Sequence, residues 1–242
     1  MANASTQSRA ARLGRSASTA GTITIAARGI GLRYEDVSNY AQSLVGQGDA
    51  LQILARHRSD ALRAHGVVSI DSTTGRFLEL IARLSSPRRI LEIGSGAGYS
   101  ALWFLKGMSA NGILEAIEID PKVAEELKGV IRKAGLARRV RIHVGPALDI
   151  LRKLKGPYQI VFIDANKDEY PQYLQYALKL TKPGAIILAD NMLWSGATFL
   201  RNIRKAGTAG IMEYTKHAFS DSRLSSLIVP LGDGLAVSVR IK

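Results

Sequence analysis

Short apolar runs alternate with amphipathic stretches along the second part of the chain. Each apolar run has about the length of a strand buried on both faces of a sheet, and each stretch after it has the period of a helix. The expected strands are Arg89–Ile93, Ile113–Ile119, Val140–Val144, Gln159–Ile163 and Ala185–Ala189, and the expected helices are Tyr99–Lys106, Pro121–Ala134, Ala147–Leu154, Tyr170–Leu180 and Ile211–Phe219. This alternation predicts an α/β fold with one doubly wound, mostly parallel sheet and right-handed crossovers.

The last part of the chain has a different pattern. Leu227–Val229 and Leu235–Arg240 are apolar runs that flank the glycine-rich turn Leu231–Gly234. Two strands joined by such a turn predict a hairpin. We therefore expect a seven-stranded sheet with an antiparallel hairpin at its C-terminal edge.

Helical patterning also precedes the first strand. The expected elements are helices over Tyr34–Leu44, Asp49–His65 and Gly75–Leu84, with an extended piece at Val67–Asp71. Ser72 or Thr73 is the expected cap of the third helix. Because these helices lie outside the alternating pattern, we expect an N-terminal helical preface that covers the ligand site.

Residues 1–33 differ in composition from the rest of the chain. They are rich in Ala, Ser, Thr and Arg, contain no acidic residue and lack the apolar run of a secretory signal. We expect a basic, flexible segment with a short strand at Thr22–Ile25, followed by a single domain over residues 34–242. A cytoplasmic location is expected, and an acid-free, Arg- and Ser-rich start leaves organelle targeting open as the alternative.

Composition excludes several classes of site. The 242 residues are 46% hydrophobic, which suits one domain with a sizeable core, and no apolar run is long enough to span a bilayer. The absence of cysteine excludes disulfides, thiolate nucleophiles and cysteine-ligated zinc. The histidines have no metal-ligand spacing, and they are His57, His65, His143 and His217. We therefore expect neither a zinc site nor a membrane partner.

The chain is strongly basic. Its formal net charge is +13, and five arginines in the first 34 residues account for part of it, which leaves +8 on the remainder. The positive electrostatic field of such a chain favours an anionic partner or substrate, such as RNA or a phosphorylated acyl carrier. A general compositional bias towards basic residues explains the charge equally well.

The first strand leads into a cluster of glycines, in the segment Arg89–Ser100. Glycines let the backbone approach a ligand closely, and a helix N-terminus after them offers free N–H groups. The spacing departs from the dinucleotide fingerprint, because Tyr99 stands at its third glycine position. Glu92 lies within the strand, and a carboxylate there suits a ligand with a positive charge. An NAD-type oxidoreductase is therefore the disfavoured alternative.

Other strand ends supply further candidate residues, since ligands of such sheets bind outside the carboxyl ends of the strands. Glu118 ends the second strand and is the expected partner of a ribose diol. Asp120 competes for that role, but it precedes Pro121 and can cap the helix that begins there. Pro146 and Ala147 follow the third strand in a turn that can flank an adenine.

The fourth and fifth strands each end in an aspartate. If these strands are neighbours, Asp164, Asp190 and Asn191 bring three oxygen ligands together, a set that suits Mg²⁺, Ca²⁺ or Mn²⁺. The alternative is that each aspartate caps the following helix. Lys167 lies at the rim of the same site, where nearby positive charges favour its neutral amine, and we expect it to act as the general base.

In combination these motifs resemble the cation-dependent O-methyltransferases, which include the catechol and caffeoyl-CoA types and bacterial relatives acting on small phenols or on tRNA hydroxyuridine. The resemblance covers about Tyr34 to Arg240 and is carried by GSGAGYSALW, IEID, VGPALDIL, FIDANKDEYPQYL, GAIILADNMLWSG and PLGDGLAVSVR. It implies a Rossmann-like fold, a homodimer and the cofactor S-adenosylmethionine (SAM). It implies SAM contacts from Ile70, Glu92, Gly94, Ser95, Gly96, Ser100, Glu118, Pro146, Ala147 and Asp164. It also implies a divalent cation, with magnesium preferred, held by Asp164, Asp190 and Asn191, and Lys167 as catalytic base.

Two segments depart from the family pattern. Val68-Ser69 stands where relatives usually have Met-Gln or Met-Asn, and the loop after Trp194 is basic, with Arg201, Arg204 and Lys205. We therefore expect methyl transfer to a hydroxyl of a catechol-like or hydroxycinnamoyl-type small molecule, and the basic loop leaves a negatively charged acceptor open. An RNA substrate, as in tRNA hydroxyuridine methylation, is the alternative that the basic loop keeps open.

Overall fold

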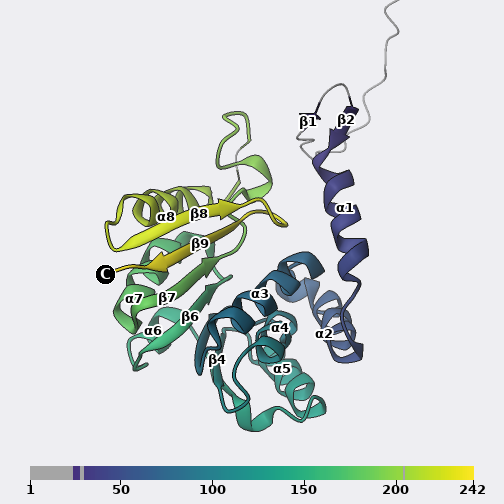
Figure 1. Cartoon of the computed structure of the whole chain (residues 1–242). Helices are drawn as coiled ribbons and strands as arrows, with labels where there is room; N and C mark the ends of the chain where they lie inside the picture. The colour runs from purple at the N-terminus through teal and green to yellow at the C-terminus, as the bar shows by residue number, and fades with distance from the viewer. Residues whose placement is uncertain (1–23, 28–29, 204) are drawn as a thin grey trace, which may run out of the picture.

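The computed structural model describes residues 24–27, 30–203 and 205–242, and Figure 1 shows a main sheet with helices on both faces and a separate antiparallel pair, β1 and β2, beside α1. The sheet has seven strands in the order β5-β4-β3-β6-β7-β9-β8. β9 pairs antiparallel with both β7 and β8, whereas the other pairs are parallel. The predicted doubly wound, Rossmann-like sheet with a C-terminal antiparallel hairpin is confirmed.

The strands and helices follow the predicted order. The strands are β1 Thr24–Ala27, β2 Ile30–Arg33, β3 Arg89–Ile93, β4 Ile113–Glu118, β5 Val140–Val144, β6 Tyr158–Ile163, β7 Thr181–Ala189, β8 Leu224–Val229 and β9 Leu235–Arg240. The helices are α1 Tyr34–Val45, α2 Ala50–Ala61, α3 Ser72–Ser85, α4 Tyr99–Gly107, α5 Pro121–Lys133, α6 Ala147–Leu151, α7 Tyr170–Leu180 and α8 Thr208–Ser220. Single 3₁₀ turns occur at Arg63–His65, Ala137–Arg139, Lys167–Glu169 and Trp194–Gly196.

Alternate residues of the central strands pack into two separate cores. In β3, Leu91 and Ile93 face the core under α6, α7 and α8, whereas Ile90 faces the core under α2, α3, α4 and α5. Successive side chains of a strand point to opposite faces, so a strand covered on both sides must be apolar at nearly every position. This explains why these strands appear in the sequence as continuous apolar runs.

The N-terminal part agrees with the expected helical preface, with two corrections. The cap of α3 is Asp71, whose carboxylate accepts a hydrogen bond from the backbone N–H of Thr74, and not Ser72 or Thr73, because the helix begins earlier than the apolar pattern does. The piece Val67–Asp71, expected to be extended, belongs to no helix or strand of the described residues. The strand expected at Thr22–Ile25 falls partly in β1, and residues 1–23 lie outside the described residues.

No helix in the described part of the chain is long and apolar enough to cross a membrane.

The sheet order places β3 and β6 side by side at the centre, although other strands separate them in sequence. The chain order reverses at this pair, which opens a crevice at the carboxyl ends of the strands.

Candidate active site

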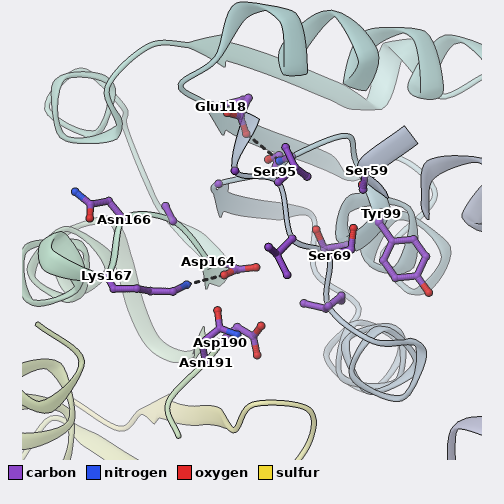
Figure 2. Close-up of a pocket in the computed structure, with 18 of the residues that line it drawn as sticks. Ser59, Ser69, Ser95, Tyr99, Glu118, Asp164, Asn166, Lys167, Asp190 and Asn191 are labelled. Carbon is purple, nitrogen blue, oxygen red and sulfur yellow. Dashed lines mark hydrogen bonds and ion pairs between the residues drawn. The ribbon is translucent and has the colours of Figure 1, made fainter. Parts of the chain in front are cut away.

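A cavity of about 960 Å³ lies at that crevice. It is lined by the turn after β3, by the residues that end β4, β6 and β7, and by the preface. In Figure 2, Lys167, Asp164, Asp190 and Asn191 lie on one side and Ser59, Ser69 and Tyr99 on the other. Glu92, at the end of β3, and Arg201 do not line the cavity, Arg204 lies outside the described residues, and every other predicted site residue lines it.

The turn after β3 brings the backbone close to the end of β6. Gly94 has a φ of +88°, and a Cβ there would lie 2.1 Å from the backbone oxygen of Asp164. Both facts require glycine at this position, because other residues rarely adopt that φ and a side chain would collide with the backbone. The predicted close approach therefore serves the packing of two neighbouring strand ends as well as a ligand.

Glu92 is a buried carboxylate with one oxygen unused. Its side chain is 0% exposed, and Oε1 accepts a hydrogen bond from the hydroxyl of Ser100, which lies in the first turn of α4. Oε2 is buried and has no hydrogen-bond partner, and the same is true of the Ser95 hydroxyl. Burial raises the pKa of Glu92 to about 7. An orphaned acceptor of this kind suits a cationic donor supplied by a ligand.

Glu118 and Asp120 have separate tasks. Glu118 lines the cavity, and its carboxylate accepts hydrogen bonds from the backbone N–H of Gly96 at 2.9 Å and of Asp120 at 3.0 Å. Asp120 caps α5 by accepting from Lys122 N–H at 2.7 Å, and its other oxygen lies 2.8 Å from Nδ1 of His65. Since Asp120 does not line the cavity, Glu118 is the better placed of the two carboxylates for a ligand diol.

The parallel register of β6 and β7 brings the predicted metal ligands together. Ile163 pairs with Ala189, so the next residues, Asp164 and Asp190, follow neighbouring strands at the same level. Asp190 is 5% exposed, and burial, with the nearby charge of Asp164, raises its pKa well above the usual range. Asn191 adopts a φ of +62°, a conformation that asparagine tolerates better than most residues.

Two carboxylates and one amide are hard oxygen donors, and two crowded acids gain from a cation between them. Among the described residues there is no cluster of three His, Asp or Glu side chains, so the amide of Asn191 is needed to complete the set. The donor chemistry fits a divalent cation of the magnesium or calcium type.

Lys167 points into this cluster. Its Nζ donates to Oδ1 of Asp164 at 2.8 Å and to the hydroxyl of Tyr170 at 2.6 Å. The start of α8 packs directly on the backbone of Lys167, since a Cβ on Gly210 would lie 2.2 Å from the Lys167 carbonyl oxygen. Lys167 is thereby held from two elements, and its amine lies where a proton can be exchanged with a hydroxyl at the cluster.

Among the described residues of the basic loop, Lys205 brings a cation to the cavity. Nζ of Lys205 lies 3.6 Å from the ring centroid of Trp194 and 3.2 Å from the hydroxyl of Ser195, and both Lys205 and Trp194 line the cavity. Nε1 of Trp194 donates to the carbonyl of Ala206 at 2.8 Å, which closes the loop back on itself. Arg201 is exposed and lies outside the cavity lining.

Several residues at the cavity, and Tyr170 beneath it, have no sequence signal. Asp233, in the turn between β8 and β9, accepts a hydrogen bond from Ser195 N–H at 2.7 Å and so fixes the segment after Asn191. Tyr170 holds Lys167, and Arg56 and His65 reach the cavity from the preface. None of them has a sequence signal, because Asp233 appeared only as a turn residue and the others as members of helical segments.

Comparison with known proteins identifies relatives of the whole fold. The sequence model of the O-methyltransferase family matches residues 45–241. A catechol O-methyltransferase of Niastella koreensis is 34% identical over 216 residues, covering 85% of this chain and 97% of that protein. A catechol O-methyltransferase of Mycobacterium tuberculosis is 39% identical over 163 residues, covering 66% of this chain and 73% of that protein. A crystal structure of a Streptomyces achromogenes O-methyltransferase involved in tomaymycin synthesis, in complex with SAM, is similar with a TM-score of 0.75 and 33% identity, covering 85% of this chain and 96% of that one.

Proposed function

The chain belongs to the O-methyltransferase family, and we propose that it transfers a methyl group from SAM to a hydroxyl of a catechol-like small molecule with the help of a divalent cation. The observation that carries this proposal is the convergence of Asp164, Asp190 and Asn191 beside the amine of Lys167. The fingerprint of an NAD-type oxidoreductase is absent from the glycine turn, and that alternative has no support from the relatives.

The cavity divides into two halves. The cofactor half consists of the turn after β3, the ends of β4 and β5, and the preface, and the acceptor half consists of the ends of β6 and β7 with the loop that carries Trp194 and Lys205. SAM, when bound, supplies an electrophilic methyl group on a sulfonium. Its ammonium group matches the unused oxygen of Glu92, and its ribose diol matches Glu118, while Ala147 and Pro146 flank the adenine.

The acceptor half handles the substrate hydroxyls. Asp164, Asp190 and Asn191 would hold the cation, which, when bound, favours the ionised form of a hydroxyl beside it. Lys167, as the neutral amine, would take the proton at Nζ and become an ammonium, and Nζ already lies within hydrogen-bond distance of Asp164. The backbone around both halves holds these groups in place, so positioning and charge neutralisation supply most of the rate enhancement.

Lys205 and Trp194 suggest the chemistry of the acceptor. The ring of Trp194 offers an apolar face at the entrance, and the ammonium of Lys205 offers a cation above it. Among the described residues Lys205 has no carboxylate within ion-pair distance. A phenolic ring that bears a carboxylate, or an acyl group attached to a phosphorylated carrier, would use both features.

The test is methyl transfer from labelled SAM to catechols and to hydroxycinnamic acids, before and after removal of metal with EDTA. We expect transfer to a vicinal diphenol, its loss after EDTA and its recovery on addition of Mg²⁺. Full activity in EDTA would contradict the cation. Transfer to undermodified tRNA without transfer to any small phenol would favour the RNA substrate instead.

A further inference from the structure

The cofactor half of the cavity is mainly acidic. Glu92 lies beneath the glycine turn, and Asp71 and Glu118 line the wall. The methionine part of SAM also carries a carboxylate, and a carboxylate that leaves water needs strong donors. Arg56 is the cation available for it, since among the described residues both lysines that line the cavity belong to the acceptor half, and His65 is paired with Asp120.

Arg56 reaches the cavity from α2 and is held by two contacts. Its Nη1 donates to the carbonyl oxygen of Ile70 at 2.5 Å, and its guanidinium carbon lies 5.3 Å from the ring centroid of Tyr99. Ile70 is a predicted SAM contact, and Tyr99 begins α4. A guanidinium fixed against a carbonyl and an aromatic ring has lost much of its rotational freedom before any ligand arrives.

Most of the donors of Arg56 remain available. A guanidinium has five N–H donors, and the one hydrogen bond that the described residues accept from it goes to Ile70. The nearest carboxylate, that of Asp60, lies 4.0 Å from Nε, and the side chain is 33% exposed. Arg56 therefore keeps donors and charge for a partner that no described side chain supplies at close range.

The position of Arg56 matches the geometry of an α-amino acid. Its stacking partner Tyr99 directly precedes Ser100, whose hydroxyl hydrogen-bonds Glu92. The ammonium and the carboxylate of SAM share one carbon, so an ammonium at Glu92 places the carboxylate within the same turn of α4. Glu92 and Arg56 each contact the first turn of α4, through Ser100 and Tyr99, and they carry the charges that the ammonium and the carboxylate require.

We propose that Arg56 binds the methionine carboxylate of SAM and thereby makes the N-terminal preface part of the cofactor site. This inference rests on the proposed function, because it names a contact to the same cofactor. It predicts that the protein distinguishes ligands that carry the carboxylate from those that lack it, with Arg56 as the source of the difference.

The experiment measures binding by calorimetry, without turnover. The ligands are S-adenosylhomocysteine (SAH), which is SAM without its methyl group, and decarboxylated SAH, which keeps the adenosine, the thioether and the amine. We expect Arg56→Met to weaken SAH by about 10- to 100-fold, the loss of a hydrogen-bonded charged group, and to leave the decarboxylated ligand within about twofold of the wild type. Arg56→Lys keeps the charge but loses the forked geometry, so its SAH affinity should fall between the two.

Arg58→Met is the matched control. Arg58 lies on the same helix, pairs with Glu126 at 2.8 Å and does not line the cavity, so both ligands should bind this variant as they bind the wild type. An SAH affinity unchanged in Arg56→Met would overturn the inference. An equal loss for both ligands, or an equal loss in Arg58→Met, would also overturn it, since the effect would then come from the packing of α2. A wild-type protein that binds neither ligand would overturn the proposed use of SAM itself.

Discussion

The cofactor half of the cavity combines backbone groups with acidic side chains that stand apart from one another, whereas the acceptor half gathers acidic and basic side chains into one cluster. On the first side, Gly94 lets the turn after β3 lie against the end of β6, and Glu118 accepts hydrogen bonds from the N–H groups of Gly96, in that turn, and of Asp120, after β4. On the second side, Asp164, Asp190 and Lys167 crowd together within one cluster. Both halves lie at the carboxyl end of the same sheet.

This contrast separates binding from chemistry. In the cofactor half, contacts made by the backbone stay in place when one side chain is replaced. Single substitutions there should therefore act mostly on cofactor affinity. A cluster of charges depends on each member, and removal of one leaves the others uncompensated. Substitutions in the acceptor half should therefore reduce turnover while the cofactor still binds. The predictions below test this division in order of expected effect.

The largest effect is expected for Asp190→Ala, which removes a buried ligand from the proposed cation site. Turnover should fall by at least about 100-fold, because a cation at this position supplies several kcal/mol of charge stabilisation. SAH affinity should stay within about twofold, measured by calorimetry. Asp168→Ala is the control, since Asp168 is exposed and does not line the cavity. Normal turnover in Asp190→Ala would end the metal assignment.

Glu92→Gln tests the most deeply buried carboxylate of the cofactor half. We expect SAH affinity to fall by about 10- to 100-fold, since the ammonium of SAH loses the charged carboxylate of Glu92 as its partner.

The same variant should change how stability depends on pH. Burial raises the pKa of Glu92 from 4.5 to about 7, so the folded state holds this proton more tightly than the unfolded state does. The free energy of unfolding of the wild type should therefore decrease between about pH 4.5 and pH 7, by up to about 3 kcal/mol from this group. Glu92→Gln should lack that decrease, as denaturation of the ligand-free proteins at pH 5 and pH 8 can show. If the free energy of unfolding depends on pH in the same way in both proteins, the Glu92 carboxyl is not desolvated in the folded state.

Glu118→Ala should have a moderate effect, with SAH weakened by about 1–3 kcal/mol through loss of the ribose contact and of two backbone hydrogen bonds. Asp120→Ala is the comparison. It removes the cap of α5 and should lower stability by about 1 kcal/mol without changing SAH affinity. The opposite ranking of the two variants in calorimetry would assign the ribose to Asp120.

The smallest effect is expected at the rim, for Lys205→Met. The KM for an acceptor with a carboxylate should rise about fivefold, since a partly exposed ion pair contributes about 1 kcal/mol, and the KM for neutral catechol should not change. Arg201→Met, in the same loop but outside the cavity lining, serves as the control. If both acceptors respond alike, Lys205 only holds the ring of Trp194 in place.

Several features of the fold were predictable because they depend on local chemistry. The apolar runs of the central strands, the glycine turn and the helix start at Pro121 are each encoded by a few neighbouring residues, and the structure has all of them at the expected positions. The cap of α3 was predicted at Ser72 or Thr73, one or two residues too late, since Asp71, Ser72 and Thr73 are all acceptable caps and only the path of the chain selects among them.

The sequence by itself determined the strand order along the chain and the chemistry at each strand end, since burial on both faces of a sheet and tight turns leave direct patterns. The tertiary structure decided which of those ends meet. Asp164 and Asp190 converge because β6 and β7 are neighbours in register, and Asp233 enters the cavity because β9 folds back beside β7. Arg56 reaches the same cavity only through the packing of α2 against α4 and α5. These contacts depend on the burial of whole faces across distant segments, and no short stretch of sequence carries that information.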